Sequence, residues 1–276
     1  MSLTVIKLGG NLLEGDSLAE LCTDIAELVG RGDRLVIVHG GGPQATAMQK
    51  RMGIEPTIVA GRRVTDAETL DIMKMVVGGR LNINLCAALV AAGVSPVGLS
   101  GASSMAVRAH KRPPRKVVGG GDEPVDFGWV GDVEGVNDDL ISRLLDGGYV
   151  PVLACLGGSR AGEIFNINGD VVANYVASSL RADHLLLVTS VPGVMRDIDD
   201  PSSRIKTMTA GEAKAAIDEE VVVGGMIPKV AESVAGLERG IGAVHIVGGL
   251  AAGQLLSELD EPGSVGTAFI SGEPSS

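Results

Sequence analysis

Two glycine-rich segments near the N-terminus carry the residues best suited to bind an anion. Lys7-Leu8-Gly9-Gly10 and His39-Gly40-Gly41-Gly42 each follow a run of aliphatic residues. Glycines at the end of a buried strand let the backbone approach a ligand closely, and amides at the start of a following helix favour anions such as phosphate. One segment of this kind can simply end a strand. Because the pattern occurs twice, we expect Gly9, Gly10, Gly41 and Gly42 to line one shared phosphate site.

A group of short polar residues opens a predicted helix in the middle of the chain. Asn166, Asn168 and Asp170 alternate along the sequence, and a helical pattern follows from Val171 to Leu180. Alternation places the two asparagines on one side of an extended segment, while Asp170 falls in the first helical turn. Such side chains at a helix start are suited to hold a substrate and to orient cations.

Two basic segments each have two interpretations. Arg62 and Arg63 precede a predicted helix, where paired guanidinium groups either bind a carboxylate in fork geometry or remain solvated. A denser basic cluster, from Arg108 to Lys116, lies within a segment, 105–136, that we expect to form one or two antiparallel hairpins. The tip of that segment is either a solvated surface or a lid over a ligand.

The spacing of apolar residues predicts an α/β protein that positions these groups. Hydrophobic residues make up 45% of the chain and aromatic residues only 2%, which favours aliphatic packing between helices and a largely parallel sheet. Gly157-Gly158 is predicted to be a turn. A new run of elements near residue 183 suggests lobes at 1–182 and 183–276. The predicted strands are 3–8, 34–38, 57–60, 95–100, 149–153, 184–189, 243–247 and 268–270, and the main predicted helices are 16–31, 42–51, 67–92, 138–146, 171–180, 210–218 and 228–239.

Composition argues against several classes of function. A formal net charge of -11 disfavours nucleic acid as the main partner, because binding a polyphosphate needs a basic surface. The N-terminus shows no signal-peptide pattern, and no apolar run reaches the length of a membrane span. The three cysteines lack metal-ligand spacing and are expected to be buried free thiols. We therefore expect a cytoplasmic protein that acts on a small molecule.

Five segments, in their order along the chain, resemble the motifs of the amino acid kinase family. Each motif alone is weak, but together they cover essentially the whole chain. The resemblance implies a three-layer αβα sandwich on a mainly parallel central sheet, with residues 1–182 binding an acyl amino acid and mediating dimerisation and residues 183–276 binding ATP. The segments are Lys7-Leu8-Gly9-Gly10, His39-Gly40-Gly41-Gly42, Arg63-Val64-Thr65-Asp66, Asn166-Ile167-Asn168-Gly169-Asp170 and Gly225-Met226-Ile227-Pro228-Lys229.

The resemblance implies an enzyme that transfers a phosphoryl group from MgATP to the side-chain carboxylate of N-acetyl-L-glutamate, a step of arginine biosynthesis. Magnesium would be carried by ATP, with no separate metal site in the protein. Lys7 and Lys229 match the two lysines that stabilise the transferring phosphoryl group, and Asp170 matches the aspartate that positions them. The loop glycines Gly10, Gly41 and Gly42 match those whose amides contact phosphate and substrate.

On the substrate side, Arg63 matches the arginine that binds the α-carboxylate. Asn166 matches a substrate-binding asparagine, and Asn168 lies beside it in the same motif. Arginine-inhibited family members carry an additional N-terminal helix that joins dimers into hexamers. Because the first strand here begins at Leu3, we expect a homodimer without feedback inhibition by arginine.

The sequence departs from the family pattern at three positions. Gly169 stands where alanine is usual, and Ser190 follows Thr189 where the family often has an aspartate near the nucleotide. Arg62 replaces a small or apolar residue, which leaves the acyl group of the substrate open. A kinase of acetylated or carrier-bound aminoadipate, or of N-succinylglutamate, is therefore an alternative. A non-catalytic sensor of amino acids or nucleotides is a further alternative of a different class.

Overall fold

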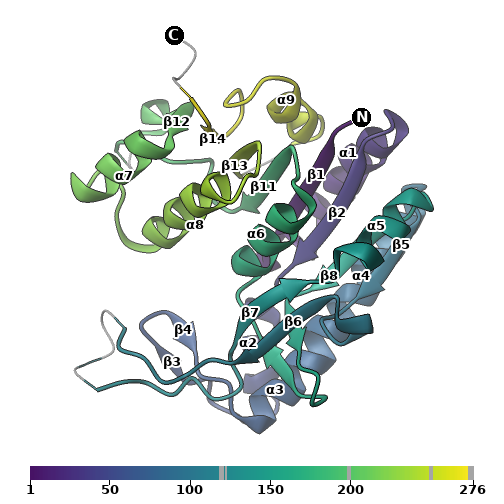
Figure 1. Cartoon of the computed structure of the whole chain (residues 1–276), viewed down its shortest axis with the longest axis vertical. Coiled ribbons are helices and arrows are strands. Elements are labelled where there is room, and N and C mark those ends of the chain that lie inside the picture. The colour runs from purple at the N-terminus through teal and green to yellow at the C-terminus, as the bar shows by residue number, and fades with distance from the viewer. Residues whose placement is uncertain (118–120, 122, 198–199, 249–250, 273–276) are drawn as a thin grey trace.

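A single eight-stranded sheet forms the centre of the molecule. The structure is a computed structural model and describes residues 1–117, 121, 123–197, 200–248 and 251–272. The strand order is β12-β14-β13-β11-β1-β2-β8-β5, and every pair is parallel except β13 with β14 (Figure 1). Strands from before residue 183 form one half of the sheet and later strands form the other. The strands are β1 (Leu3–Leu8), β2 (Arg34–His39), β5 (Pro96–Leu99), β8 (Val150–Ala154), β11 (His184–Thr189), β12 (Thr207–Thr209), β13 (Ala243–Gly248) and β14 (Thr267–Ile270).

Helices cover both faces of this sheet. They are α1 (Asp16–Gly30), α2 (Gly42–Arg51), α3 (Ala67–Met73), α4 (Asn82–Ala91), α5 (Asp138–Asp146), α6 (Gly169–Leu180), α7 (Ala210–Asp218), α8 (Ile227–Glu238) and α9 (Gln254–Asp260). On one face α1 packs against α4 and α9, and on the other α6 packs against α5 and α8 (Figure 1). The predicted three-layer αβα sandwich on a mainly parallel sheet is therefore confirmed.

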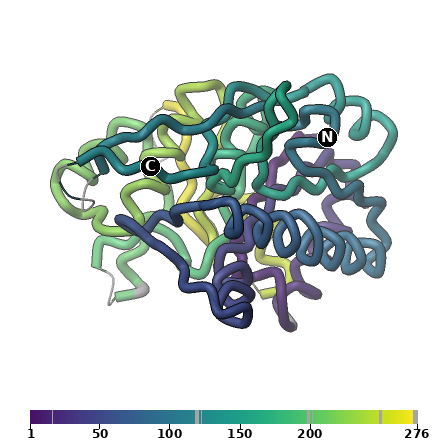
Figure 2. The backbone as a smooth tube through the Cα atoms, turned by 90° about the horizontal axis from the view of Figure 1, so that it is seen from below, coloured from purple at the N-terminus to yellow at the C-terminus, as the bar shows by residue number. Residues whose placement is uncertain are grey.

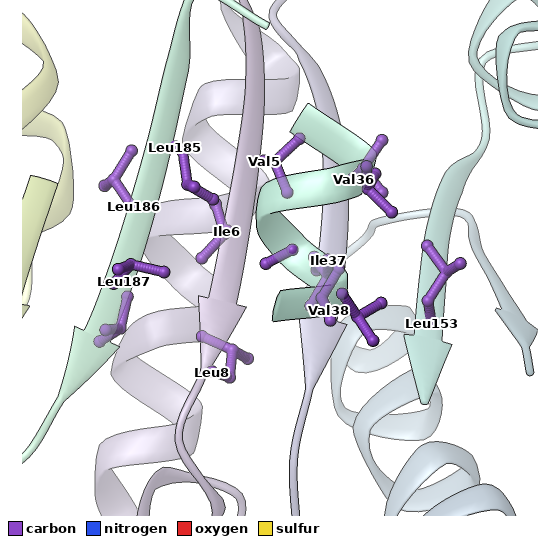
Figure 3. Packing of buried hydrophobic residues seen from close by; sticks show 14 of the residues in the cluster. Val5, Ile6, Leu8, Val36, Ile37, Val38, Leu153, Leu185, Leu186 and Leu187 are labelled. Carbon is purple, nitrogen blue, oxygen red and sulfur yellow. The ribbon is translucent and has the colours of Figure 1, made fainter. Parts of the chain in front are cut away.

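The central strands are buried on both sides, as their continuous aliphatic runs predict. Val5, Ile6, Val36 and Ile37 are fully buried, and Figure 3 shows them with leucines of β8 and β11 in one aliphatic core. Because β1 and β2 are parallel neighbours, with Leu8 opposite His39, both strands end at the same edge of the sheet. The two glycine segments that follow them therefore leave the sheet side by side.

A second, four-stranded sheet lies beside the first and corrects one prediction. It contains β6 (Val107–Lys111), β7 (Gly131–Val136), β9 (Leu156–Gly158) and β10 (Ile164–Asn166) in the order β10-β9-β6-β7. The predicted turn at Gly157-Gly158 is wrong, because both residues belong to β9. A Cβ atom on Gly157 would lie 2.5 Å from Ile167 Cδ1 and 2.7 Å from Ala109 Cβ. These glycines thus serve close packing of a buried strand.

The predicted hairpin of segment 105–136 is present in β6 and β7, which pair antiparallel. Residues 118–120 and 122 lie outside the described residues. The short strand predicted at 57–60 is one arm of a hairpin, β3 (Ile58–Val59) and β4 (Arg62–Arg63). The segment before β7 runs beside this hairpin, as a bridge between Thr65 and Gly128 shows (Figure 1).

One helix corrects the expectation that nothing in the chain is long enough to span a membrane. Between α3 and α4 the chain continues as a π-helix, η2 (Lys74–Leu81), so that helical structure runs from Ala67 to Ala91 without a break (Figure 2). This helix is long and apolar enough to cross a membrane, but the core helices of soluble proteins can be equally long and apolar. We assign it to the core, because Val77, Leu81 and Leu85 belong to the central hydrophobic cluster.

Candidate active site

The two glycine segments meet, as the sequence predicts. A Cβ atom on Gly10 would lie 2.9 Å from Pro43 Cδ and 3.3 Å from Gly41 Cα, so only glycine lets these loops touch. Gln44 Nε2 in α2 donates to Gly10 O over 2.7 Å and joins the loops further. In the described part of the chain, the Gly41 and Gly42 amides have no acceptor. Two free amides at a helix start form a site that suits an anion.

Beside the loops, one carboxylate holds two lysines. Asp170 Oδ1 lies 2.8 Å from Lys7 Nζ, and Asp170 Oδ2 lies 2.8 Å from Lys229 Nζ. The three groups come from β1, α6 and α8, so distant parts of the sequence converge here. Their side chains are only 11%, 13% and 21% exposed for Lys7, Asp170 and Lys229. All three predicted catalytic residues therefore lie together.

The charge of this triad favours an anionic ligand. Burial alone would raise the pKa of Asp170, but attraction to Lys7 and Lys229 outweighs it and lowers the pKa below its ordinary value. Asp170 therefore stays ionised, and two ammonium groups with one carboxylate leave one excess positive charge. The start of α6 adds to this field, because a Cβ built on Gly169 lies 3.8 Å from Gly40 Cα.

Arg63 lies along one face of α2 and contacts the last residue of the second glycine segment. Its guanidinium donates to Gly42 O over 3.1 Å, to Thr46 Oγ1 over 2.5 Å and to Gln49 Oε1. Burial lowers the pKa of Arg63, and none of these three partners carries charge. The half-buried cation is thus held in place without being neutralised, which suits an arginine that binds a carboxylate.

The two asparagines have different surroundings. Asn166 Nδ2 donates to Thr65 Oγ1 over 3.0 Å, close in sequence to Arg63. Asn168 is the N-cap of α6, and its Oδ1 accepts a hydrogen bond of 2.8 Å from Asp170 N. Asn168 therefore fixes the start of the helix that carries Asp170.

Sequence reasoning missed the residues of α2 that support the site. Gln44 holds Gly10, while Thr46 and the buried Gln49 hold Arg63. Gln49 Nε2 in turn donates to Thr69 Oγ1 over 3.1 Å. A signal was present, because Gly42, Thr46 and Gln49 are spaced by four and three residues and share one helical face.

The basic cluster of the hairpin is partly neutralised. Lys111 Nζ lies 3.4 Å from Asp126 Oδ2, and Arg112 Nη2 lies 2.6 Å from Asp132 Oδ1. Burial, followed by repulsion from Arg112 and Arg62, lowers the pKa of Arg115. The positive charges of Arg62 and Arg115 therefore repel each other. Both interpretations of the tip, a solvated surface and a lid over a ligand, stay predictions.

Comparison with known proteins gives a consistent result. The model of the amino acid kinase family matches residues 2–248. Two relatives, both called acetylglutamate kinase, come from Sorangium cellulosum (strain So ce56) and Anaeromyxobacter dehalogenans (strain 2CP-1 / ATCC BAA-258). The first is 55% identical over 266 residues, which cover 96% of this chain and 94% of the relative. The second is 53% identical over 270 residues, which cover 98% and 99%.

Solved structures share the fold. N-acetylglutamate synthase from Neisseria gonorrhoeae, complexed with coenzyme A and N-acetyl-glutamate, is 29% identical with a TM-score of 0.83. The match covers 99% of this chain but 60% of the synthase. Carbamate kinase from Giardia lamblia bound to AMP-PNP is 19% identical with a TM-score of 0.68. That match covers 98% of this chain and 99% of the carbamate kinase.

Proposed function

The chain belongs to the amino acid kinase family, and from this premise we propose how it phosphorylates N-acetyl-L-glutamate with ATP. The product is N-acetyl-L-glutamyl 5-phosphate, an acyl phosphate of arginine biosynthesis. Relatives at 51% to 55% identity over nearly the full chain bear the name of this activity. The observation that carries the mechanism is the Asp170 carboxylate, which lies 2.8 Å from the ammonium groups of both Lys7 and Lys229.

The reaction needs charge stabilisation more than proton transfer. A glutamate side chain has an ordinary pKa of about 4.3, so it is already an ionised nucleophile at neutral pH. The barrier comes from bringing this anion against the polyphosphate of ATP. Lys7 and Lys229, held apart by Asp170, reduce that repulsion and bind the oxygens of the phosphoryl group as it moves. The substrate MgATP brings its own magnesium to the phosphates.

The glycine loops complete the phosphate site. The Gly41 and Gly42 amides donate to the phosphoryl oxygens, and Gly10 lets the first loop approach the second closely. Gly9 N donates to Val188 O over 3.1 Å and ties the first loop to β11. The nucleotide lies over residues 183–276, beyond the end of β11. Ser190 stands where many family members have an acidic group near the nucleotide, but that group takes no part in the phosphoryl transfer, which in our proposal uses Asp170.

The acyl amino acid lies on the other side of this group, over residues 1–182. Arg63 binds its α-carboxylate with the positive charge that Gln49 and Thr46 leave uncompensated. Asn166 donates to Thr65 and keeps its own carbonyl oxygen for the amide N–H of the acetyl group. Asn168 supports the site through its cap on α6.

We also propose a cytoplasmic homodimer. Met75, Ile83 and Val90 are more than half exposed and are spaced by eight and seven residues along the helix that runs from Ala67 to Ala91. Their helix contacts β5, the strand at the edge of the central sheet. An apolar helix face beside an unpaired strand edge fits a second copy of the chain. A reducing cytoplasm fits the three free cysteines, Cys22, Cys86 and Cys155.

Acyl phosphate formation, trapped as the hydroxamate, tests the proposed reaction. MgATP is offered with N-acetyl-L-glutamate, N-succinyl-L-glutamate, N-acetyl-L-aminoadipate or aspartate in parallel. We expect a clear preference for N-acetyl-L-glutamate. Preference for another acid would exclude N-acetyl-L-glutamate as the substrate but would leave the proposed phosphoryl transfer to a carboxylate intact. No product with any of the acids would overturn the proposed reaction itself.

A further inference from the structure

His39 is a buried histidine that the mechanism above does not use. It is the last residue of β2, it is 0% exposed, and the glycine loop follows it directly. Its Nδ1 lies 2.9 Å from Gly40 O, and its Nε2 lies 2.9 Å from Asn82 Nδ2. The imidazole thus links the loop to Asn82, the first residue of α4.

The hydrogen bonds of the neighbours determine which ring nitrogen carries the proton. Asn82 Nδ2 also lies 3.0 Å from Val152 O, and a carbonyl can only accept, so the NH2 group of Asn82 must face both Val152 and His39. His39 Nε2 is therefore an acceptor without a proton. His39 Nδ1 must then carry the proton and donate it to Gly40 O. Burial lowers the pKa of His39, which keeps the ring neutral in this arrangement.

This donor fixes one peptide plane of the phosphate loop. Gly40 N donates to Leu8 O over 3.1 Å, so the chain is anchored just before the loop. His39 then holds the carbonyl of the same glycine. In a trans peptide the carbonyl and the next amide point in opposite directions. Fixing Gly40 O therefore fixes the direction of the Gly41 N–H.

Resting on the proposed phosphoryl transfer, we propose that His39 is a positioning residue that orients the Gly41 amide toward the phosphoryl group. Leu81 and Val77 close the space behind Gly41, where an added Cβ atom would approach them to 2.5 Å and 2.9 Å. The side chains of Leu81 and Val77 thus pack against the loop, and the imidazole fixes the orientation of its Gly40–Gly41 peptide plane. A preorganised amide costs no rearrangement when charge develops on the phosphoryl oxygens.

Two substitutions separate this role from a purely structural one. The amide nitrogen of asparagine sits as many bonds from Cα as Nδ1 of histidine, whereas the polar end of glutamine matches Nε2. His39→Asn therefore keeps the donor to Gly40 O and loses the contact with Asn82. His39→Gln keeps the contact with Asn82 and loses the donor to Gly40 O. Both remove the ring, so each is the matched control for the other.

The experiment compares kcat, KM for both substrates and the thermal midpoint for the wild type, His39→Asn and His39→Gln. We expect His39→Asn to keep kcat within about threefold and His39→Gln to lower kcat by about tenfold or more, since a donor of this kind is worth up to 10² to 10³ in rate. Equal kcat in both variants, or loss in His39→Asn alone, would overturn the role. A wild type without activity would overturn the proposed function instead.

A second measurement does not depend on whether the variants fold. The 15N chemical shifts of the His39 ring in the wild type distinguish the two neutral tautomers and the imidazolium. We expect the neutral form with the proton on Nδ1 near pH 7. A proton on Nε2 would remove the donor to Gly40 O, and the positioning role would then be wrong.

Discussion

At the scale of single residues, the site depends on charges that are left partly unbalanced. Asp170 neutralises only one of its two lysines, and Arg63 is held by three uncharged acceptors. A second carboxylate at either place would strengthen the resting structure but would compete with phosphate or substrate for the same cations. Because the partners of Arg63 are uncharged, its positive charge stays available to the carboxylate of the substrate.

Arg63→Ala should weaken binding of N-acetyl-L-glutamate more than it slows the chemical step. A charge-assisted hydrogen bond is worth about 1.5 to 3 kcal/mol, so KM for the acid should rise by roughly 10-fold to 150-fold. The kcat at saturating acid and the KM for ATP should change only a few-fold. Initial-rate kinetics measure this, with Arg143→Ala removing an exposed arginine of α5 as the control. An unchanged KM for the acid would exclude Arg63 as the carboxylate anchor.

His39 also gives a prediction about pH. Burial lowers its pKa below the ordinary value of about 6.5, so the unfolded chain takes up the proton first as pH falls. The stability that neutral His39 provides is therefore complete above pH 6.5 and declines as pH falls toward the folded-state pKa. The slope from this one group is at most about 1.4 kcal/mol per pH unit.

Urea unfolding of the wild type and His39→Asn between pH 7.5 and pH 5, roughly the range around the ordinary histidine pKa, isolates that contribution. The difference in unfolding free energy between the two proteins should shrink as pH falls. Other titrating groups, including the partly buried His184, are common to both proteins and cancel. A difference that stays constant with pH would contradict a lowered pKa for His39.

At the scale of elements, helix starts and strand ends place the catalytic groups. α6 delivers Asp170 in its first turn because Asn168 caps it, and α8 delivers Lys229 near its own start. The start of α6 also contains the family departure Gly169. A Cβ atom there would lie 3.4 Å from Lys7 Cε, an ordinary contact. Glycine is therefore not required at this position.

Gly169→Ala should accordingly stabilise the protein by about 0.4 to 1 kcal/mol, because alanine loses less backbone freedom on folding. Activity should stay within about twofold or threefold. Gly10→Ala is the matched control, since its Cβ atom would lie 2.9 Å from Pro43 Cδ and should lower both stability and activity. Urea unfolding and initial rates measure both variants. A destabilised Gly169→Ala would show that the start of α6 is tighter than the structure indicates.

Many elements could be predicted from the sequence, for identifiable reasons. Continuous aliphatic runs identified the buried parallel strands, and the helix predicted at 138–146 is α5, where the Asn137 side chain accepts a hydrogen bond from Leu140 N. The prediction of a turn at Gly157-Gly158 was wrong, because a glycine that is needed for close packing cannot be distinguished in the sequence from one that is needed for a turn. The strand β12 was missed because three residues are too few to show a period.

The site was predictable only where a residue carries charge or belongs to a motif. Lys7, Asp170 and Lys229 were chosen from motifs, and the structure brings them together. Gln49 looked like an ordinary helix residue, because its role depends on Arg63, a residue of a different element. Contacts between elements are the part of a site that a single sequence encodes least directly.

At the scale of the whole molecule, the sheet joins two halves, and the triad links them. Lys7 belongs to the first half of the chain and Lys229 to the second, so Asp170 connects the proposed sites for acid and ATP. Among the described residues, β5 is the last strand of this sheet, next to the apolar residues of α4.

The assembly proposal predicts a particle with the mass of two 28.2-kDa chains in light scattering. Ile83→Asp should shift the population toward monomer, because it places a charge in the apolar face. Val223→Asp is the control, since Val223 is also exposed but lies away from that face, just before α8. A monomeric wild type at micromolar concentration, or an equal effect of both substitutions, would exclude this interface.

The most direct test of the whole account follows the phosphorus atoms. 31P NMR of MgATP with N-acetyl-L-glutamate should show the γ-phosphate signal of ATP disappear while ADP and an acyl phosphate, which carries the former γ-phosphorus, appear in equal amounts. Under the same conditions Lys7→Met should be folded and slower by about two orders of magnitude or more, because one preorganised cation is missing. No acyl phosphate in the wild type, or near-normal turnover in Lys7→Met, would contradict the central claim.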